Sequence, residues 1–270
     1  MRQKNRKSRD NRGTPPAGPR KQQQAPKARL KIDLFGIHAV QAAWRNPQRF
    51  IHALYITDSA LRDFDLAPDL KRPEPTLISR EELDRALPVG SVHQGIALSC
   101  QPLDEISVED LIIQSSHTEK TTLVMLDQVT DPHNVGAILR TACAFGANGL
   151  ILQKKHAPEP KGILAKTACG ALEHVPLAYE TNLTRTLEKL QEAGFTVIGL
   201  DERGDEEVLN TYKSHKTVLV LGAEGPGLRR LVKEQCNLLA RLPMHGPMPS
   251  INVSNAAAIA LYALNAKVQT

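Results

Sequence analysis

Three short segments of this chain carry polar side chains that could organise chemistry on a bound ligand. The first contains Asn134 and Arg140, and the second contains Glu224 among glycines. The third contains Ser250 and Asn252, just before an alanine-rich stretch. A guanidinium stays protonated in proteins, so Arg140 is suited to hold an anionic group or to stabilise a developing negative charge. Each residue also has a simpler role open to it, because Asn134 is a good helix cap and Arg140 a common solvated charge.

The three segments follow apolar stretches that are predicted to be strands, and their loops begin after Asp127, Leu221 and Leu242. Short apolar strands that alternate with helices are typical of a largely parallel sheet covered on both faces. Ligands of such sheets bind beyond the carboxyl ends of the strands. This rule selects the three loops as the expected binding region.

The loop after Leu221 is the richest in glycine. Gly222, Gly225 and Gly227 let backbone amides close around a ligand, and the helix that follows offers its positive end. The spacing matches neither the dinucleotide-binding fingerprint nor a P-loop, which argues against a nucleotide-dependent oxidoreductase. Gly136, in the first segment, is predicted to let another group approach the backbone of a helical turn.

A further set of elements precedes these loops. Helices and strands alternate from about residue 32 to residue 100 and predict a small α/β domain, in which a capping box at Ser79 opens one helix. Residues 101–120 are expected to be a linker with one helical turn. The expected strands are 51–57, 94–100, 122–127, 149–152, 174–179, 196–200, 217–221 and 240–243. The expected helices are 36–45, 79–87, 134–145, 162–172, 183–193, 228–236 and 253–268.

Residues 1–31 differ from the rest of the chain in charge. They hold eleven Lys or Arg and one acid, a net of +10, whereas the remaining 239 residues carry −5. Their Lys, Arg, Gln and Pro content predicts a disordered arm, since it cannot bury enough apolar surface to become ordered. Basic arms commonly contact nucleic-acid phosphates, and the alternative is a solubilising tail without a partner.

The cysteines and the apolar runs indicate the compartment. Cys100, Cys143, Cys169 and Cys236 form no C-x-x-C pair, so a zinc site or a disulfide scaffold is not indicated and buried free thiols are favoured. No signal peptide is indicated, and the longest wholly apolar run, 256–264, is too short to span a bilayer. The sequence therefore predicts a cytoplasmic protein with no metal and no membrane partner.

Taken in order, N-x-x-x-x-x-R, L-G-x-E-G-x-G-L and L-P-M…S-I-N-V-S resemble the motifs of the SpoU (TrmH-type) branch of the SPOUT RNA 2′-O-methyltransferases. The likeness covers about residues 121–270. Residues 32–100 resemble the L30e-like RNA substrate-binding domain that precedes the catalytic domain in members acting on large-subunit rRNA. Within the family, the motifs are most similar to those of the bacterial 23S rRNA guanosine-2′-O-methyltransferases.

The resemblance implies a SPOUT α/β domain with a C-terminal trefoil knot, and transfer of a methyl group from S-adenosyl-L-methionine to an RNA ribose 2′-hydroxyl. It assigns catalytic or RNA-facing roles to Asn134, Arg140, Glu224, Ser250 and Asn252. It assigns cofactor binding to Gly222, Gly227, Leu242, Met244 and Ile251. It also implies a homodimer with the active site at the subunit interface.

Two other functions stay open at this point. A tRNA substrate would keep the chemistry, although the extra N-terminal domain favours the larger rRNA. A non-catalytic RNA-binding relative would keep the fold, although the presence of all five polar residues argues against it. The chemistry itself requires alignment of the hydroxyl with the methyl group and then loss of the hydroxyl proton. Arg140 is expected to act there as a clamp and alkoxide stabiliser rather than as the base.

Overall fold

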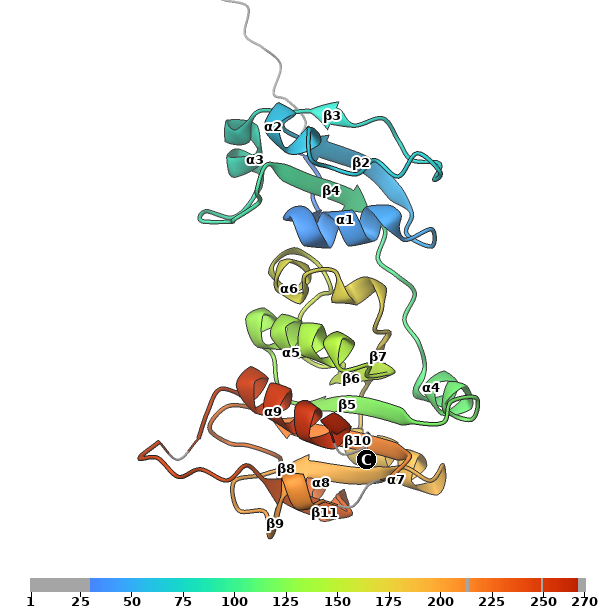
Figure 1. Cartoon of the computed structure of the whole chain (residues 1–270), viewed down its shortest axis with the longest axis vertical. Coiled ribbons are helices and arrows are strands. Elements are labelled where there is room, and N and C mark those ends of the chain that lie inside the picture. The colour runs from blue at the N-terminus through green and yellow to red at the C-terminus, as the bar shows by residue number, and fades with distance from the viewer. Residues whose placement is uncertain (1–29, 212–213, 249, 267–270) are drawn as a thin grey trace, which may run out of the picture. The chain divides into compact units, whose positions relative to one another are not determined.

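The computed structural model of the chain describes residues 30–211, 214–248 and 250–266. The predicted basic arm therefore lies, apart from its last two residues, outside the described residues. The described residues from Lys31 onward form one compact unit, in which they build two β-sheets (Figure 1).

The first sheet has four strands, in the order β1 (Leu34–Phe35), β4 (Ile96–Cys100), β2 (Ile51–Ile56) and β3 (Thr76–Leu77). β4 is antiparallel to both of its neighbours, and β3 is parallel to β2. The helices of this region are α1 (Ile37–Arg45), α2 (Asp58–Leu61) and α3 (Arg80–Ala86). The longer elements match the predicted ones, whereas β1 and β3, with two residues each, are too short to produce an alternating pattern.

Local signals explain where two of these helices begin and end. The Ser79 hydroxyl accepts a hydrogen bond from the Glu82 amide and the Glu82 carboxylate accepts one from the Ser79 amide, which confirms the predicted capping box. At the end of α1, the Arg72 guanidinium donates to the backbone carbonyls of Trp44, Asn46 and Arg49. Carbonyls at a helix end would otherwise lack partners, so Arg72 closes this end.

The second sheet has seven strands, and all of its pairings are parallel. Its order is β7 (Leu177–Glu180), β6 (Gly149–Gln153), β5 (Thr121–Asp127), β10 (Lys216–Gly222), β8 (Thr196–Leu200), β11 (Leu238–Arg241) and β9 (Glu206–Glu207). The accompanying helices are α4 (Val108–Ser115), α5 (Pro132–Ala144), α6 (Gly162–Ala168), α7 (Leu183–Glu192), α8 (Arg230–Gln235) and α9 (Val253–Ala266). Two 3-10 turns, η1 (Ala171–Glu173) and η2 (Val208–Asn210), complete this region.

Alternate residues of β5 face two separate cores, because successive side chains of a strand point to opposite faces. Val124 and Leu126 pack in a core with α5, α6 and α9, whereas Leu123 and Met125 pack in a core with α4, α7 and α8. These two groups of helices therefore cover opposite faces of the sheet. The predicted parallel sheet with both faces covered is confirmed.

Some predicted boundaries are wrong. The helix expected over 162–172 ends at Ala168, because Cys169 and Gly170 both adopt the left-handed conformation. The strand expected over 240–243 is β11, which ends at Arg241, so Leu242 already belongs to the loop. The single helical turn expected in 101–120 is the two-turn α4, whose N-cap is Ser107. Apolar residues continue past the true ends at Ala168 and Arg241, so periodicity alone misplaces these two boundaries.

A buried ion pair links the region of the first sheet to η1. The Arg49 Nη2–Glu173 Oε1 distance is 2.5 Å, and the two side chains are 3% and 2% exposed. Asn46 also donates to Glu173, at 2.7 Å. A buried charge needs such partners. The contact therefore holds the segment after α1, in the region of the first sheet, against η1, in the region of the second sheet. None of the described helices is long and apolar enough to cross a membrane.

Candidate active site

The strand order brings the loops that follow four neighbouring strands, β5, β10, β8 and β11, together along one edge of the parallel sheet. Asp127 and Gly222 are paired at the ends of β5 and β10, so the loops that follow these strands start side by side. β8 is the neighbour of β10 on the side away from β5, and β11 is the next strand beyond β8. The predicted loops after β5, β10 and β11 therefore do share this edge. The loop after β8 shares it too, and the prediction did not include that loop.

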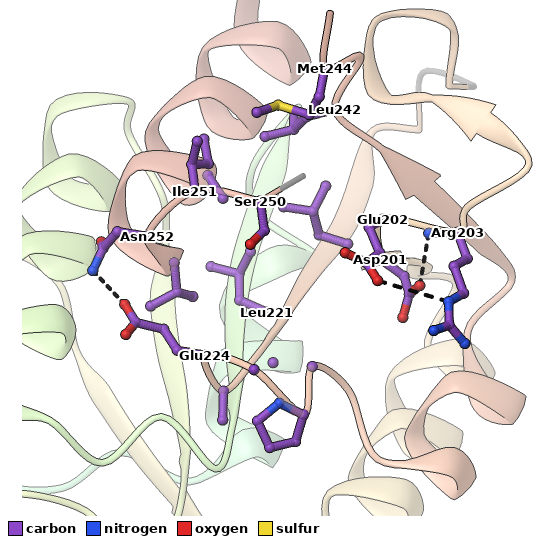
Figure 2. A pocket seen from close by; sticks show the side chains of 18 of the residues that line it. Asp201, Glu202, Arg203, Leu221, Glu224, Leu242, Met244, Ser250, Ile251 and Asn252 are labelled. Atoms are coloured by element: carbon purple, nitrogen blue, oxygen red, sulfur yellow. Dashed lines mark hydrogen bonds and ion pairs between the residues drawn. The ribbon is translucent and has the colours of Figure 1, made fainter. Parts of the chain in front are cut away.

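A cavity of about 520 Å³ opens at the carboxyl ends of β8, β10 and β11 (Figure 2). This volume is within the range of about 300–1,000 Å³ that is usual for small-ligand sites. All five residues predicted to hold the cofactor line it, namely Gly222, Gly227, Leu242, Met244 and Ile251. Glu224, Ser250 and Asn252 line it as well, and Figure 2 shows the Ser250 hydroxyl directed into the pocket. Asn134 and Arg140 are not among the lining residues.

Asn134, Glu224 and Asn252 form a hydrogen-bonded cluster at one wall of the pocket. The Asn134 amide donates to Glu224 Oε1 at 3.2 Å, and the Asn252 amide donates to the same oxygen and to Asn134 Oδ1, the latter at 2.9 Å. The three residues come from α5, from the loop after β10 and from the residue before α9. The cluster thus joins all three predicted segments in one place.

The two asparagines of the cluster differ in whether they also cap a helix. Asn134 is not a cap, because Asp131 caps α5 by accepting from the His133 amide at 3.0 Å, with Pro132 next to it. Its side chain is therefore free for the cluster. Asn252 does cap α9, since its Oδ1 accepts from the Ser254 amide at 2.8 Å, while its NH₂ group serves the cluster.

Arg140 lies apart from the cluster. Its guanidinium is exposed and contacts the Cys169 sulfur at 3.6 Å. At 3.6 residues per turn, six residues place Asn134 and Arg140 roughly 120° apart around α5, so their side chains point in different directions. Within the described chain, Arg140 does not reach the residues with which it was predicted to act.

The glycine-rich loop owes its shape to contacts within the protein. A Cβ on Gly222 would lie 2.2 Å from the carbonyl carbon of Gly227, so this glycine lets the loop fold back on itself. The amide at the start of α8, that of Arg229, donates to the buried Asp127 at 2.9 Å, and the Arg229 Nε donates to it at 2.7 Å. The prediction was that the start of this helix faces a ligand. The Arg229 amide, at the start of α8, instead donates to a side chain of the protein and is not available to a ligand.

Gly136 also serves packing. A Cβ at this position would lie 2.6 Å from the Leu164 carbonyl oxygen, so its absence lets α5 approach α6 closely. The group predicted to approach this backbone is therefore part of the protein itself.

The loop after β8 adds charged residues that sequence reasoning missed. Asp201, Glu202 and Arg203 line the pocket opposite Glu224 and Asn252 (Figure 2), and Lys233 of α8 lines it too. Burial works to raise the pKa of Asp201, but hydrogen bonds from Lys233 Nζ, at 2.5 Å, and from the Arg203 amide outweigh it and hold that pKa below its usual value. The signal was available, since 196–200 was predicted as a strand of the same parallel sheet.

The cysteines are free, but only Cys100 is fully buried, so the prediction of four buried thiols is too broad. Burial raises the pKa of Cys100 to about 11. Burial, reinforced by the charge of Asp127, raises that of Cys236 to about 12. In the described part of the chain, no three His, Cys, Asp or Glu side chains are arranged to hold a metal ion.

Comparison with known proteins identifies both regions of the chain. Residues 121–262 match the model of the SpoU rRNA Methylase family, and residues 34–106 match that for RNA 2′-O ribose methyltransferase substrate binding. The chain is 37% identical over 238 residues to the 23S rRNA (guanosine-2′-O-)-methyltransferase RlmB of Pseudomonas putida, with 85% of this chain and 94% of the relative covered. The RlmB of Pasteurella multocida is 38% identical over 240 residues, which cover 86% and 97% of the two chains.

A solved structure agrees in fold. The SpoU methyltransferase AviRb from Streptomyces viridochromogenes, in complex with the cofactor AdoMet, matches with a TM-score of 0.70 and 25% identity. The match covers 88% of this chain and 90% of the other. The similarity in sequence and the similarity in structure thus each extend over most of this chain, and the chain belongs to the SpoU rRNA methylase family.

Proposed function

We propose that this protein transfers the methyl group of S-adenosyl-L-methionine to the 2′-hydroxyl of a guanosine ribose in 23S rRNA. The observation that carries the proposal is the Asn134–Glu224–Asn252 cluster at the wall of a pocket of about 520 Å³. The relatives named as 23S rRNA (guanosine-2′-O-)-methyltransferases, and the AdoMet-bound AviRb, support the substrate and the cofactor.

The pocket residues fit this cofactor chemically. Leu221, Leu242 and Ile251 offer apolar surface for a flat adenine, whereas Glu224 and Asp201 place carboxylates at opposite ends of the pocket (Figure 2). The cofactor carries a positive sulfonium and an ammonium group, which carboxylates stabilise. When bound, it supplies an electrophilic methyl group.

The cluster is suited to hold a ribose beside that methyl group. Glu224 accepts hydrogen bonds from both asparagines, which fixes the orientation of their amides. Fixed amide and carboxylate groups can align the 2′-hydroxyl, and such alignment is a large part of the acceleration available to a two-substrate reaction. Ser250 contributes a further hydroxyl from the pocket wall. The proton of the 2′-hydroxyl passes to water or to an RNA phosphate, since no protein group in the cluster is a strong base.

We further infer a homodimer in which the partner's Arg140 completes the site. Arg140 of the same chain is exposed and lies away from the cluster. α9 carries two exposed apolar side chains, Ile259 and Tyr262, and Tyr262 stacks edge-on against Phe145 at the end of α5. A second copy packed on this face would cover them. We also infer a cytoplasmic location, and the trefoil knot remains a prediction.

The role of Arg140 can be tested by Arg140→Lys. Lysine keeps the charge but loses the planar fork that holds a phosphate or an alkoxide with two hydrogen bonds. We expect turnover at pH 7 to fall about 100-fold with S-adenosyl-L-methionine affinity unchanged. Near-wild-type turnover would show that a guanidinium is not required there.

Sedimentation of wild type and Tyr262→Lys tests the dimer, with the variant expected to be monomeric.

The function is tested by incubating the protein with labelled S-adenosyl-L-methionine and total RNA from a strain that lacks the activity, and then separating the RNA by size. Label in large-subunit rRNA is the expected result. Label confined to tRNA would keep the chemistry and overturn the substrate. No label in naked RNA or in ribosomal precursors, with the cofactor bound, would indicate an RNA-binding relative without activity.

A further inference from the structure

We propose that the loop between β6 and α6, residues 154–161, binds RNA phosphates and guides the substrate between the first sheet and the Asn134–Glu224–Asn252 cluster. This inference rests on the proposed function, because it names the path of the RNA substrate. The loop is called the β6 loop below.

One end of the β6 loop borders the active site. β6 is the neighbour of β5, and Leu152 is paired with Leu126. The β6 loop therefore leaves the sheet beside Asp127, where the segment leading to Asn134 begins. A nucleotide held at the cluster has this loop as its neighbour on the side away from the pocket, since the pocket lies toward β8 and β11.

The other end reaches the region of the first sheet. The Gly162 amide, directly after the loop, donates to the Asp33 carbonyl at 2.8 Å, and Asp33 precedes β1. One turn further along α6, Lys166 Nζ donates to Gln94 Oε1 at 2.6 Å, close to the start of β4. The β6 loop thus spans the distance between the active-site edge and the region that matches a substrate-binding model.

The side chains at the start of the loop are available to a polyanion. Lys154, Lys155 and His156 are exposed. Within the described residues, neither Lys154 nor Lys155 has an ion-pair partner, whereas Lys161 is paired with Glu159. Free lysines beside a substrate path attract phosphates and release counterions when they bind them.

The backbone of the loop is held in place by contacts on both sides of these lysines. The Lys154 amide donates to the Glu180 carbonyl at 2.8 Å, which extends the pairing with β7 by one residue. Ala157 packs against the core that contains α5 and α6. The lysines therefore project from a fixed backbone, so the entropy lost on binding RNA is small compared with that of a disordered arm.

Charge excludes the opposite flank as the RNA path. The segment 201–207, after β8, holds five carboxylates and one arginine, and part of it lines the pocket. A phosphate chain would be repelled there. The β6 loop, with three lysines and one glutamate, is the flank that attracts it.

The test compares two double variants of the full chain that remove the same charge. Lys154→Ala/Lys155→Ala removes the proposed contacts. Lys189→Ala/Arg230→Ala is the control, since these residues lie on α7 and α8 and pair with Glu109 and Glu234. The affinity for a 23S rRNA fragment is measured across a salt titration, with S-adenosyl-L-methionine affinity and melting temperature recorded in parallel.

For the loop variant we expect about tenfold weaker RNA binding at low salt and a salt slope flatter by about 1.4, at ~0.7 for each phosphate contact with a single strand. Cofactor affinity and melting temperature should be unchanged, and the control should bind RNA like wild type. If both variants weaken RNA binding equally, or if neither does while wild type methylates RNA, the inference is overturned and the proposed function stands. If wild type binds no RNA but a protein partner is lost from the loop variant, the loop is a protein contact instead.

Discussion

The loops after β6 and β8 leave the same edge of one parallel sheet, on either side of the β5–β10 pair, and they carry opposite charge. The β6 loop is basic, and its first two lysines have no ion-pair partner among the described residues. The segment 201–207 is acidic, and its Asp201 is paired with Lys233. One flank thus suits an anionic polymer and the other encloses a pocket that suits a cationic small molecule. Under the proposed function, strand order would place the two substrates on separate sides of the Asn134–Glu224–Asn252 cluster.

Loss of the group between the two flanks should have the largest effect. Glu224→Ala removes the acceptor shared by Asn134 and Asn252, so methyl transfer should fall about 100- to 1,000-fold at saturating RNA and cofactor. Glu202→Gln is the matched control, because Glu202 also lines the pocket but does not contact the cluster. Equal losses in single-turnover assays of the two variants would contradict a specific role for Glu224.

The contact that holds the β5 and β10 loops together should come next. Arg229→Ala leaves the fully buried Asp127 with only the backbone amide, so unfolding free energy should drop by roughly 2–3 kcal/mol, less than for a fully buried pair because Arg229 is 39% exposed. Chemical denaturation measures this, with Arg230→Ala as the control on the exposed neighbour. A drop of equal size in both variants would show that the pair is not special.

The acidic flank should affect the cofactor alone. Asp201→Asn weakens the pairing with Lys233 at the pocket wall, and we expect about tenfold weaker S-adenosyl-L-methionine binding with unchanged RNA affinity. Because the pKa of Asp201 lies below its usual value, the carboxylate is charged throughout the neutral range, so the loss should be the same from about pH 5 to 8. Asp205→Asn, in the same loop but outside the pocket, is the control, and calorimetry measures both affinities. Weaker RNA binding by Asp201→Asn would contradict the assignment of RNA and cofactor to different flanks.

The smallest effect on stability is expected for Tyr179 of β7, the strand next to β6. The Tyr179 hydroxyl on β7 is buried and has no hydrogen-bond partner among the described residues, and burial, with the charge of Glu105, raises its pKa to about 12. Tyr179→Phe should therefore keep RNA affinity and gain up to about 1 kcal/mol of stability. A raised pKa in the fold means that wild type loses stability as pH rises from about 10 to 12, whereas the variant should not. Urea unfolding at pH 8 and 10.5 tests this, and a less stable variant would reveal a partner for the hydroxyl.

Much of the site follows from the sequence because its parts are local. Each predicted loop follows a strand of recognisable apolar pattern, and the rule for parallel sheets places these loops at one edge. The family motifs then supply Asn134, Glu224 and Asn252, which the structure brings into contact. The five predicted cofactor residues line one cavity for the same reason.

The remaining differences come from packing, or from local signals that compete with one another in the sequence. The acidic run from Asp201 is typical of a solvated turn, and only the packing of α8 reveals that Asp201 is paired inside the pocket. A capping role is open to Asn134 on sequence, but Asp131 before a proline is the stronger signal for a helix start, and Asp131 is the cap. The motif groups Arg140 with Asn134, and within the described chain their side chains point in different directions, so a shared site would need Arg140 from a second copy.

The most direct test of the central claim is the position of the methyl group within the modified nucleoside. RNA labelled by the wild-type protein and by Glu224→Ala is digested to nucleosides and analysed by mass spectrometry. We expect 2′-O-methylguanosine from large-subunit rRNA with wild type and about 100-fold less with the variant. Label on a base instead of the ribose, or equal amounts of 2′-O-methylguanosine from both proteins, would contradict it.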